Sequence, residues 1–366
     1  MDKIRNLSKT TKSNTITYGI VIAAFLIMQG LIAAHAVSHS IIGLLVPICS
    51  YICLAISLNL VVGISGELSL GHAGFMSVGA FSGLVVASFF KGIVGSGPLC
   101  LLIAIVVAGV FAAIAGVLIG LPVMRLRGDY LAIVTLAFGE IIKNLLNNMY
   151  VGLDDRGLHF SMKSAEALGM QGGKILIEGP KGAVGIPQLS SFLAGFILIL
   201  FTLFVVLNLI NSRTGRAIMA VRDNRIAAES VGINVTKYRL IAFVVSAALA
   251  GMAGALYAMN FSSIAPKKFD FNTSILILVF VVLGGMGNIR GGIIAAALLT
   301  VLPEQLRFIG DYRMLIYAIV LIGVMIVTNN PKIQSVLGEF KERFRRRGDD
   351  KAAQAADAVE GGAKHE

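Results

Sequence analysis

The 366-residue sequence contains no tryptophan, only three cysteines, and few charged residues, which make up 14% of the chain. Soluble domains carry about 25% charged residues, so the composition excludes a soluble globular protein. Cys49, Cys53 and Cys100 lie inside apolar runs, where thiols behave as small hydrophobic side chains, and they indicate no extracellular disulfide framework. Any aromatic belt at a membrane interface has to be formed by tyrosine and phenylalanine.

Sequence motifs for catalysis are also missing. The chain has neither an H-E-x-x-H zinc motif nor a G-x-x-x-x-G-K-[ST] phosphate-binding loop. Gly63-Ile64-Ser65-Gly66 matches the short G-x-S-G pattern of rhomboid-type intramembrane proteases, which pair that serine with a histidine on another helix. The five histidines are His35, His39, His72, His159 and His365. None lies in the middle of a separate apolar run, so we expect no catalytic residue, no metal and no cofactor on this chain.

Long apolar runs are what the sequence has in abundance. Hydrophobic residues make up 56% of the chain, and its mean hydropathy is +0.84. Because one crossing of a bilayer takes about 20 apolar residues, the sequence predicts an all-α, polytopic transmembrane helical bundle of about ten spans with glycine-broken or re-entrant segments. We place the spans at 16–36, 40–63, 71–90, 98–122, 129–147, 190–211, 239–260, 273–287, 289–306 and 313–329.

The distribution of charge predicts the topology. The net charge of +11 is concentrated in a basic N-terminus (1–15), in the segment 212–238, and in a basic, partly disordered tail (331–366). Basic residues near the ends of spans stay in the cytoplasm, so these three parts are expected there. Within the transmembrane domain (16–330), residues 150–190 then form a long external loop. We interpret the charge as topology and contact with the lipid bilayer, with no binding of nucleic acid.

The segment Arg213–Arg239 lies between two expected spans and is basic and punctuated by glycine. Ala227, Ala228 and Gly232 indicate a short helix followed by a tight turn, displayed where a soluble partner can dock. We therefore expect a membrane protein whose activity is driven by a soluble partner that docks on its cytoplasmic side.

Two clusters of glycine interrupt the expected spans. Helices broken at membrane depth occur where the backbone faces protein or a water-filled cavity, so both clusters are candidates for a substrate path. The alternative is a plain turn between two short helices. The glycines are Gly63, Gly66, Gly71 and Gly74 in the first cluster, and Gly284, Gly285, Gly287, Gly291 and Gly292 in the second.

A few polar residues near these clusters and inside the spans are candidates for lining the path, because an ionisable group in a membrane is a functional hypothesis by default. They are Ser65, Glu67, Ser69, His72, Ser77, Thr135 and Glu140. Glu140 and Lys143 share a helix face, so a structural ion pair is an alternative for Glu140. Serine and threonine in a span also often bond their own backbone.

Four stretches together resemble a known family. Leu58–Ala80, Leu126–Glu140, Gly215–Leu256 and Val281–Leu299 are similar to the larger permease subunit of bacterial branched-chain amino acid ABC importers, in order over about residues 40–330. The resemblance implies an inner-membrane permease that forms the translocation path for branched-chain or related amino acids. It implies as partners a second homologous permease, two cytoplasmic ATPases that carry ATP and Mg, and an external binding protein on which most substrate specificity resides.

In that family a cytoplasmic loop docks into a groove on the ATPase. The resemblance assigns this role to Arg222, Asp223, Asn224, Arg225, Ala227, Ala228, Glu229 and Gly232. Import permeases carry an E-A-A-x-x-x-G pattern there, but Ile226 stands at the glutamate position, and Glu229 is a possible substitute one turn later. The alternative is a solvated amphipathic loop.

Two other functions stay open from the residues alone. A stand-alone secondary transporter would need carboxylates in mid-span for a coupling ion, and the chain offers Glu140 and Glu67. An intramembrane serine hydrolase is a distant third, on the G-x-S-G match alone.

Overall fold

The computed structural model describes residues 9–35, 38–91, 95–126, 128–154, 157–170, 173–306, 310 and 312–329. The predicted tail (331–366) and the first eight residues of the predicted basic N-terminus therefore lie outside the described residues. The chain divides into two units, residues 1–301 and residues 302–366.

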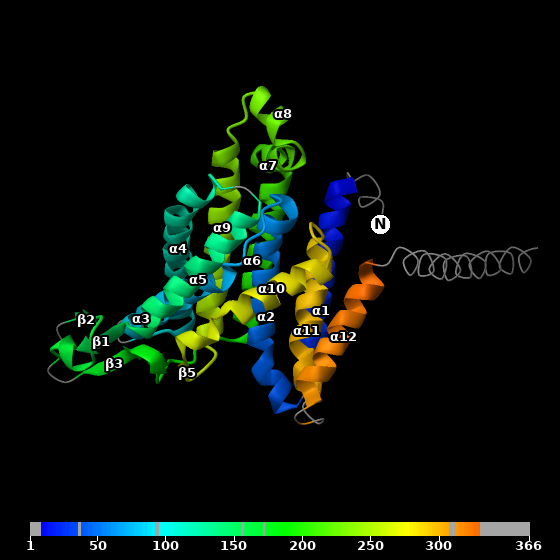
Figure 1. Cartoon of the computed structure of the whole chain (residues 1–366). Coiled ribbons are helices and arrows are strands. Elements are labelled where there is room, and N and C mark those ends of the chain that lie inside the picture. The colour runs from blue at the N-terminus through cyan, green and yellow to red at the C-terminus, as the bar shows by residue number, and fades with distance from the viewer. Residues whose placement is uncertain are drawn as a thin grey trace, which may run out of the picture. The chain divides into compact units, whose positions relative to one another are not determined.

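Helices dominate the first unit (Figure 1). They are α1 (Lys9–Ala33), α2 (His39–Asn59), α3 (His72–Phe90), α4 (Gly97–Val123), α5 (Asp129–Asn147), α6 (Phe192–Asn211), α7 (Arg213–Asp223), α8 (Arg225–Ser230), α9 (Val235–Ala258) and α10 (Phe271–Leu283). A π-helical turn, Leu60–Ile64, extends α2, and 3-10 turns lie at Glu166–Leu168, Gly179–Lys181 and Pro266–Lys268. Helix α11 (Ile289–Gln305) crosses the boundary between the units, and α12 (Arg313–Asn329) lies in the second unit.

Seven of the described helices are long and apolar enough to cross a membrane. They are α1 to α6 and α9, which correspond to the first seven predicted spans. The predicted fold class, a polytopic helical membrane protein, is confirmed. Helices α10, α11 and α12 have 13, 17 and 17 residues and fall short of this length, so the total of ten spans stays a prediction.

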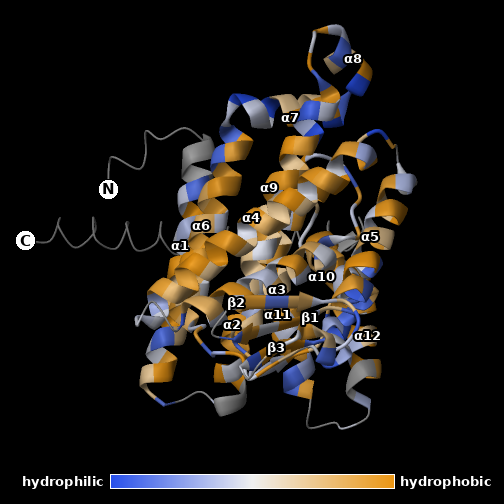
Figure 2. Ribbon diagram, turned by 90° about the vertical axis from the view of Figure 1, so that its left-hand side faces the viewer, coloured by the Kyte–Doolittle hydropathy of each residue, from blue (hydrophilic) through white to orange (hydrophobic). Residues whose placement is uncertain are grey.

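The interior of the first unit is built around α2, α3 and α9. In the membrane-crossing stretches of α2 and α9, 72% and 67% of the residues are buried, against 11% in α1. Helix α1 therefore lies at the periphery. Figure 2 shows hydrophobic residues covering much of α4, α6 and α9, whereas hydrophilic residues gather on α7.

Glycines allow α3 and α9 to touch backbone to backbone. A Cβ atom on Gly79 would lie 2.1 Å from the carbonyl oxygen of Gly251, and one on Gly254 would lie 2.0 Å from the carbonyl oxygen of Met76. Lipid tails are as apolar as leucine, so membrane helices associate largely through such close packing of small residues. We call this contact the α3–α9 seam.

The segment predicted as a long loop, 150–190, contains most of a small β-sheet. Its strands are β1 (Tyr150–Asp154), β2 (Gly157–Ser161), β3 (Lys174–Glu178), β4 (Ala183–Val184) and β5 (Ser263–Ile264), in the order β2-β1-β3-β4-β5. All neighbouring pairs are antiparallel, and β4 pairs with β5, which lies between α9 and α10. In Figure 1 the strands lie at one end of the first unit and α7 and α8 at the other.

Candidate functional site

The first glycine cluster coincides with a non-helical stretch between Ile64 and His72, which we call the 65–71 segment. Its start is a helix cap, because the N–H groups of Ser65 and Glu67 donate to the carbonyls of Leu60 and Val61, each at 3.0 Å. Gly66 has a φ of +74°, a left-handed conformation that favours glycine at the end of a helix. The glycine thus ends the helix and turns the chain into the segment.

The second glycine cluster spans the turn between the end of α10 at Leu283 and the start of α11 at Ile289, and the first turn of α11, and it touches the first cluster. The Asn59 Oδ1 atom accepts a hydrogen bond of 2.8 Å from the Gly287 N–H. A Cβ atom on Gly63 would lie 2.0 Å from Asn59 Oδ1 and 2.2 Å from the Gly287 nitrogen. The two breaks therefore form one backbone contact, held by an asparagine that the sequence analysis missed.

Other glycines of the clusters also mark close backbone approaches. A Cβ atom on Gly284 would lie 2.3 Å from the Gly292 nitrogen, and one on Gly291 would lie 1.7 Å from the Gly284 carbonyl oxygen. Gly285 has a φ of +87°, which is a left-handed conformation. The turn from α10 into α11 is thus packed too tightly for side chains.

Helices α5 and α10 hold the far end of the 65–71 segment. The Leu70 N–H donates to Thr135 Oγ1 of α5 over 3.1 Å, and the Ala73 N–H donates to Ser274 Oγ of α10 over 3.2 Å. Gly71 and Gly74 let α5 approach, since Cβ atoms there would lie 2.5 Å from the Thr135 carbonyl oxygen and 2.9 Å from Gly139 Cα. Thr135, one of the predicted path residues, is thus a support of the segment.

Most of the predicted path residues are enclosed by the chain in this conformation. Ser65, Ser69, His72, Ser77 and Thr135 are each at most 3% exposed. His72 Nε2 and Ser57 Oγ are hydrogen-bonded at 2.9 Å, and Ser77 and Thr135 donate to the carbonyls of Gly74 and Ala132 in their own helices. For Ser77 and Thr135 the predicted alternative, a bond to the backbone of the same helix, is confirmed.

Glu140 forms an ion pair with Lys143 within α5, as the spacing predicts, and its side chain is 38% exposed. Glu140 lines a small depression together with Gly74, Phe269 and Asp270. Asp270 caps α10 by accepting a hydrogen bond from the Thr273 N–H. Burial raises the pKa of Asp270, but hydrogen bonds from Thr273 and Asn272 outweigh it, so the pKa lies below its ordinary value and the group is ionised at neutral pH.

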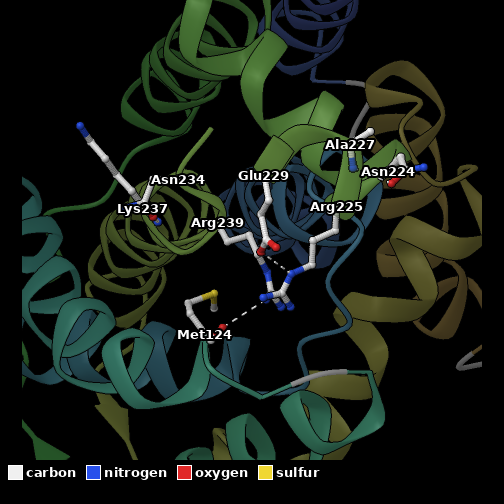
Figure 3. Close-up of polar contacts among 8 residues, drawn as sticks. All are labelled: Met124, Asn224, Arg225, Ala227, Glu229, Asn234, Lys237 and Arg239. Carbon is white, nitrogen blue, oxygen red and sulfur yellow. Dashed lines mark hydrogen bonds and ion pairs between the residues drawn. The ribbon is translucent and has the colours of Figure 1, made fainter. Parts of the chain in front are cut away.

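The short helix and tight turn predicted in the basic segment are present, and the structure adds a second helix, so that the segment forms α7 and α8. Asn224 separates the two helices, and its Oδ1 atom accepts a hydrogen bond of 3.0 Å from the Ala227 N–H to cap α8. Gly232, with a φ of +83°, makes the tight turn that follows, and Asn234 caps α9 through the Lys237 N–H (Figure 3). Ala228 is buried together with Val221 and Val235, and these three side chains form a small hydrophobic core between α7, α8 and α9.

The exposed surface of α8 and of the turn that follows it carries both apolar and charged side chains. Ile226 is 80% exposed and Val231 is 74% exposed. Glu229 pairs with Arg225 at 3.0 Å, one helical turn away on the same helix.

Arg222, in the last turn of α7, connects this helix pair to the first break. Its Nη1 atom donates to the Gly63 carbonyl oxygen over 3.2 Å. A Cβ atom on Gly66 would lie 2.7 Å from Arg222 Cγ, so the arginine stem packs directly on the glycine. Arg222 also pairs with Asp223 at 2.8 Å.

Glu67, another predicted path residue, forms an ion pair with Arg239 of α9. The Arg239 side chain is only 4% exposed, and its Nη1 atom donates to the Met124 carbonyl oxygen over 3.1 Å (Figure 3). A buried guanidinium needs such partners, because an unpaired buried charge is strongly destabilising. The pair ties the 65–71 segment to the start of α9.

A cavity of about 410 Å³ lies between these elements, and we call it the α7–α8 cavity. Its lining comes from the 65–71 segment, from helices α7, α8 and α9, and from the turn that precedes α5. The lining residues are Ser65, Gly66, Glu67, Leu68, Gly128, Val221, Arg222, Arg225 and Arg239.

Seven membrane-length apolar helices among the described residues, two breaks joined through their backbones, and an exposed helix pair that contacts one break define a multi-pass membrane protein. Residues 40–327 match the model of the family described as "Branched-chain amino acid transport system / permease component", and the chain belongs to this family. The resemblance seen in the sequence is confirmed.

Named relatives agree with this family. The chain is 38% identical over 291 residues to the high-affinity branched-chain amino acid transport system permease protein LivM of Salmonella typhimurium LT2, and 37% identical over 287 residues to LivM of Escherichia coli K12. These alignments cover 75% of this chain and 66% of each relative, just under two thirds of their length. The ribose import permease protein RbsC of Escherichia coli K12 is 30% identical over 127 residues, 32% of this chain and 40% of its own. No solved structure matches the chain.

Proposed function

We propose that this chain is the permease subunit of an ATP-driven importer and forms the translocation path for branched-chain or related amino acids delivered by an external binding protein. Its partners are a second homologous permease and two ATPases that carry ATP and Mg. Family membership and the printed names of the LivM relatives support the substrate class. The contact between Arg222 and Gly63 is the observation that supports a conformational change driven by partner subunits that bind α7 and α8.

The orientation follows from the two ends of the first unit. Helices α7 and α8 lie at one end and the β-strands at the other (Figure 1). Basic segments beside spans stay in the cytoplasm, so α7, α8 and both termini face the cytoplasm of a bacterial inner membrane. The sheet and the Pro266–Lys268 turn then face outward and form the docking surface for the binding protein.

Residues 222–232 dock on the ATPase in this proposal, with Ile226 and Val231 as apolar anchors. When the ATPases bind ATP, they move α7 and α8, and Arg222 transmits the movement to Gly63 and Gly66. Because Gly63 touches Gly287, the second break moves with the first. The partners favour one state over another only through different free energies of interaction with each state.

The path opens in this mechanism where the 65–71 segment leaves its supports. Thr135 Oγ1 accepts one hydrogen bond from the Leu70 N–H, and Ser274 Oγ accepts one from the N–H of Ala73, just after the segment; these bonds hold the segment on α5 and α10. Each net bond contributes about 1 kcal/mol, which a conformational change can exchange for water. Ser65, Glu67, Ser69, His72, Ser77 and Thr135 would then line the path, with Glu140 toward its outer end.

Co-purification tests the importer directly. The chain is tagged in its native host, extracted gently in detergent, washed, and its bound proteins are identified by mass spectrometry. We expect an ATPase together with a second, similar permease. A clean monomer or homodimer without any ATPase would contradict the proposal and favour the stand-alone secondary transporter.

The Ile226→Asp variant is expected to lose its ATPase while keeping its fold. The side chain is 80% exposed, so its replacement disturbs no packing inside the chain. Loss of an apolar interface anchor costs about 2 kcal/mol, which is about thirtyfold in affinity. The measurement is the amount of ATPase retained on the tagged chain, with uptake as a second readout.

Thr236→Asp is the matched control, because it adds the same charge to an exposed position just outside 222–232. If Ile226→Asp retains the ATPase as well as Thr236→Asp does, residues 222–232 are not the docking segment.

A further inference from the structure

A second cavity, of about 440 Å³, lies between the end of α9, strand β5 and the Pro266–Lys268 turn, and we call it the β5 cavity. Strand β5 lies with the other strands at one end of the first unit (Figure 1). The glycine breaks and the α7–α8 helix pair contribute none of its lining, so the mechanism above gives the cavity no role. The lining residues are Tyr257, Phe261, Ser263, Ile264, Ala265, Lys267 and Lys268.

The charge in the lining of the β5 cavity is unbalanced. Lys267 and Lys268 are exposed, and neither pairs with a carboxylate among the described residues. The seven lining residues include no acidic one. Asp270, close by in the sequence, does not line the cavity, and its carboxylate accepts hydrogen bonds from the Thr273 N–H and from Asn272 Nδ2. Two lysine side chains are therefore available to an anion.

Beside the lysines, the wall of the cavity is aromatic and closely packed. Tyr257 is 4% exposed, and its ring contacts the rings of Tyr51, Phe261 and Phe269 at centroid distances of 5.8, 5.0 and 6.5 Å. Small-molecule sites typically combine such an apolar wall with a few polar groups that fix the orientation of the ligand. The wall thus suits a ligand that carries an apolar group next to its negative charge.

Hydrogen bonds hold the backbone around the cavity in place. Strand β5 pairs with β4, with Ser263 opposite Val184. The Lys268 N–H donates to the Ala265 carbonyl over 3.1 Å, and Thr273 Oγ1 donates to the Lys268 carbonyl over 2.8 Å. The cavity is therefore formed before a ligand binds, and its volume falls within the usual range of small-molecule sites, about 300–1,000 Å³.

We propose that the β5 cavity binds a small organic anion, a carboxylate that carries a short aliphatic group. The carboxylate accepts hydrogen bonds from the ammonium groups of Lys267 and Lys268, and the aliphatic group packs on Tyr257 and Phe261. Hydrogen bonds between charged groups are about twice as strong as neutral ones. A zwitterion such as a free amino acid binds less well, because its ammonium group meets two lysines and no carboxylate in the lining. The site does not rest on the proposed function.

Thermal-shift titration of the purified protein, with the partners that co-purify, tests the site. The probes are isocaproate, L-leucine, L-leucinamide and inorganic phosphate at neutral pH and constant ionic strength. Isocaproate has the skeleton of leucine without the amino group, so we expect it to raise the unfolding temperature in a saturable manner. Its dissociation constant should lie at least tenfold below that of L-leucine, and L-leucinamide, which lacks the carboxylate, should have no effect at this site.

Variants with matched controls locate the binding. Ser263→Asp places a competing carboxylate in the lining and is expected to abolish the effect of isocaproate, whereas Ser262→Asp adds the same charge at the neighbouring exposed position, outside the lining, and is expected to retain it. Lys268→Gln is expected to raise the dissociation constant of isocaproate about tenfold. Lys163→Gln removes an exposed lysine outside the lining and should leave the constant unchanged.

The opposite results would overturn the proposal. They are the lack of a saturable effect of isocaproate, or equal losses in Ser263→Asp and Ser262→Asp, which would show a general charge effect. Binding of L-leucine that is as tight as that of isocaproate and is lost in Ser263→Asp would overturn the assignment to an anion. Stabilisation by phosphate alone would favour a phosphate or lipid-headgroup site instead. Uptake is not measured, so failure of this test is separate from failure of the importer proposal, which co-purification decides.

Discussion

Replacing Gly63 with alanine is expected to abolish uptake and to destabilise the protein by about 3 kcal/mol or more. The added Cβ atom would lie 2.0 Å from Asn59 Oδ1 and 2.2 Å from the Gly287 nitrogen. One of these neighbours is a backbone atom, so the methyl group cannot be accommodated by a change of rotamer alone. The two breaks would have to separate, with loss of the bond between Asn59 and Gly287.

Uptake of radiolabelled leucine and the apparent unfolding temperature in detergent measure this effect. Gly43→Ala is the matched control, because Gly43 lies in the same helix with no atom within 4 Å of the added Cβ position. We expect Gly43→Ala to retain both properties. Equal behaviour of the two variants would show that the backbone contact between the breaks is not required.

Replacing Glu67 with glutamine is expected to destabilise the folded protein by about 3–5 kcal/mol, because it leaves the buried guanidinium of Arg239 without its ion-pair partner. Glutamine keeps the shape of the side chain and removes only the charge. Glu229→Gln breaks the exposed pair with Arg225 and is expected to cost about 0.5 kcal/mol or less. Both variants remove one carboxylate from an arginine, so a difference between their unfolding temperatures measures the effect of burial and not of pairing alone.

The measurement is the unfolding temperature of each variant in detergent. The double variant Glu67→Gln with Arg239→Gln checks the cause, because removing both charges should destabilise less than the sum of the two single changes. Additive effects, or equal effects of Glu67→Gln and Glu229→Gln, would contradict a coupled buried pair.

Much of the fold was predictable from the sequence because its signals are local. Seven of the apolar runs in the sequence coincide with the seven described helices that are long and apolar enough to cross a membrane. Ala227, Ala228 and Gly232 predict a short helix and a turn, since helix propensity and left-handed glycine act within a few residues. The spacing of Glu140 and Lys143 predicts their pair for the same reason.

Contacts between distant parts of the chain were not predictable. In the sequence, Arg239 is interpreted as the end of a basic loop, and no neighbouring residue indicates that it pairs with Glu67. Asn59 gives a faint signal, an amide in an apolar run four residues before Gly63, but its partner Gly287 lies far along the chain, in the turn between α10 and α11. The β-sheet was missed because its strands have two to five residues, too few to show an alternating pattern.

The α3–α9 seam also limits which amino-acid substitutions this chain can tolerate during evolution. At Gly79, Gly251 and Gly254 even the smallest side chain would collide with backbone, so single replacements there have no neutral intermediate. Residues on α4 such as Leu102 and Leu118 are more than half exposed toward the surroundings of the helix, where one apolar side chain serves as well as another. Substitutions should therefore accumulate on the outward-facing positions of α4, while the glycines of the seam stay unchanged.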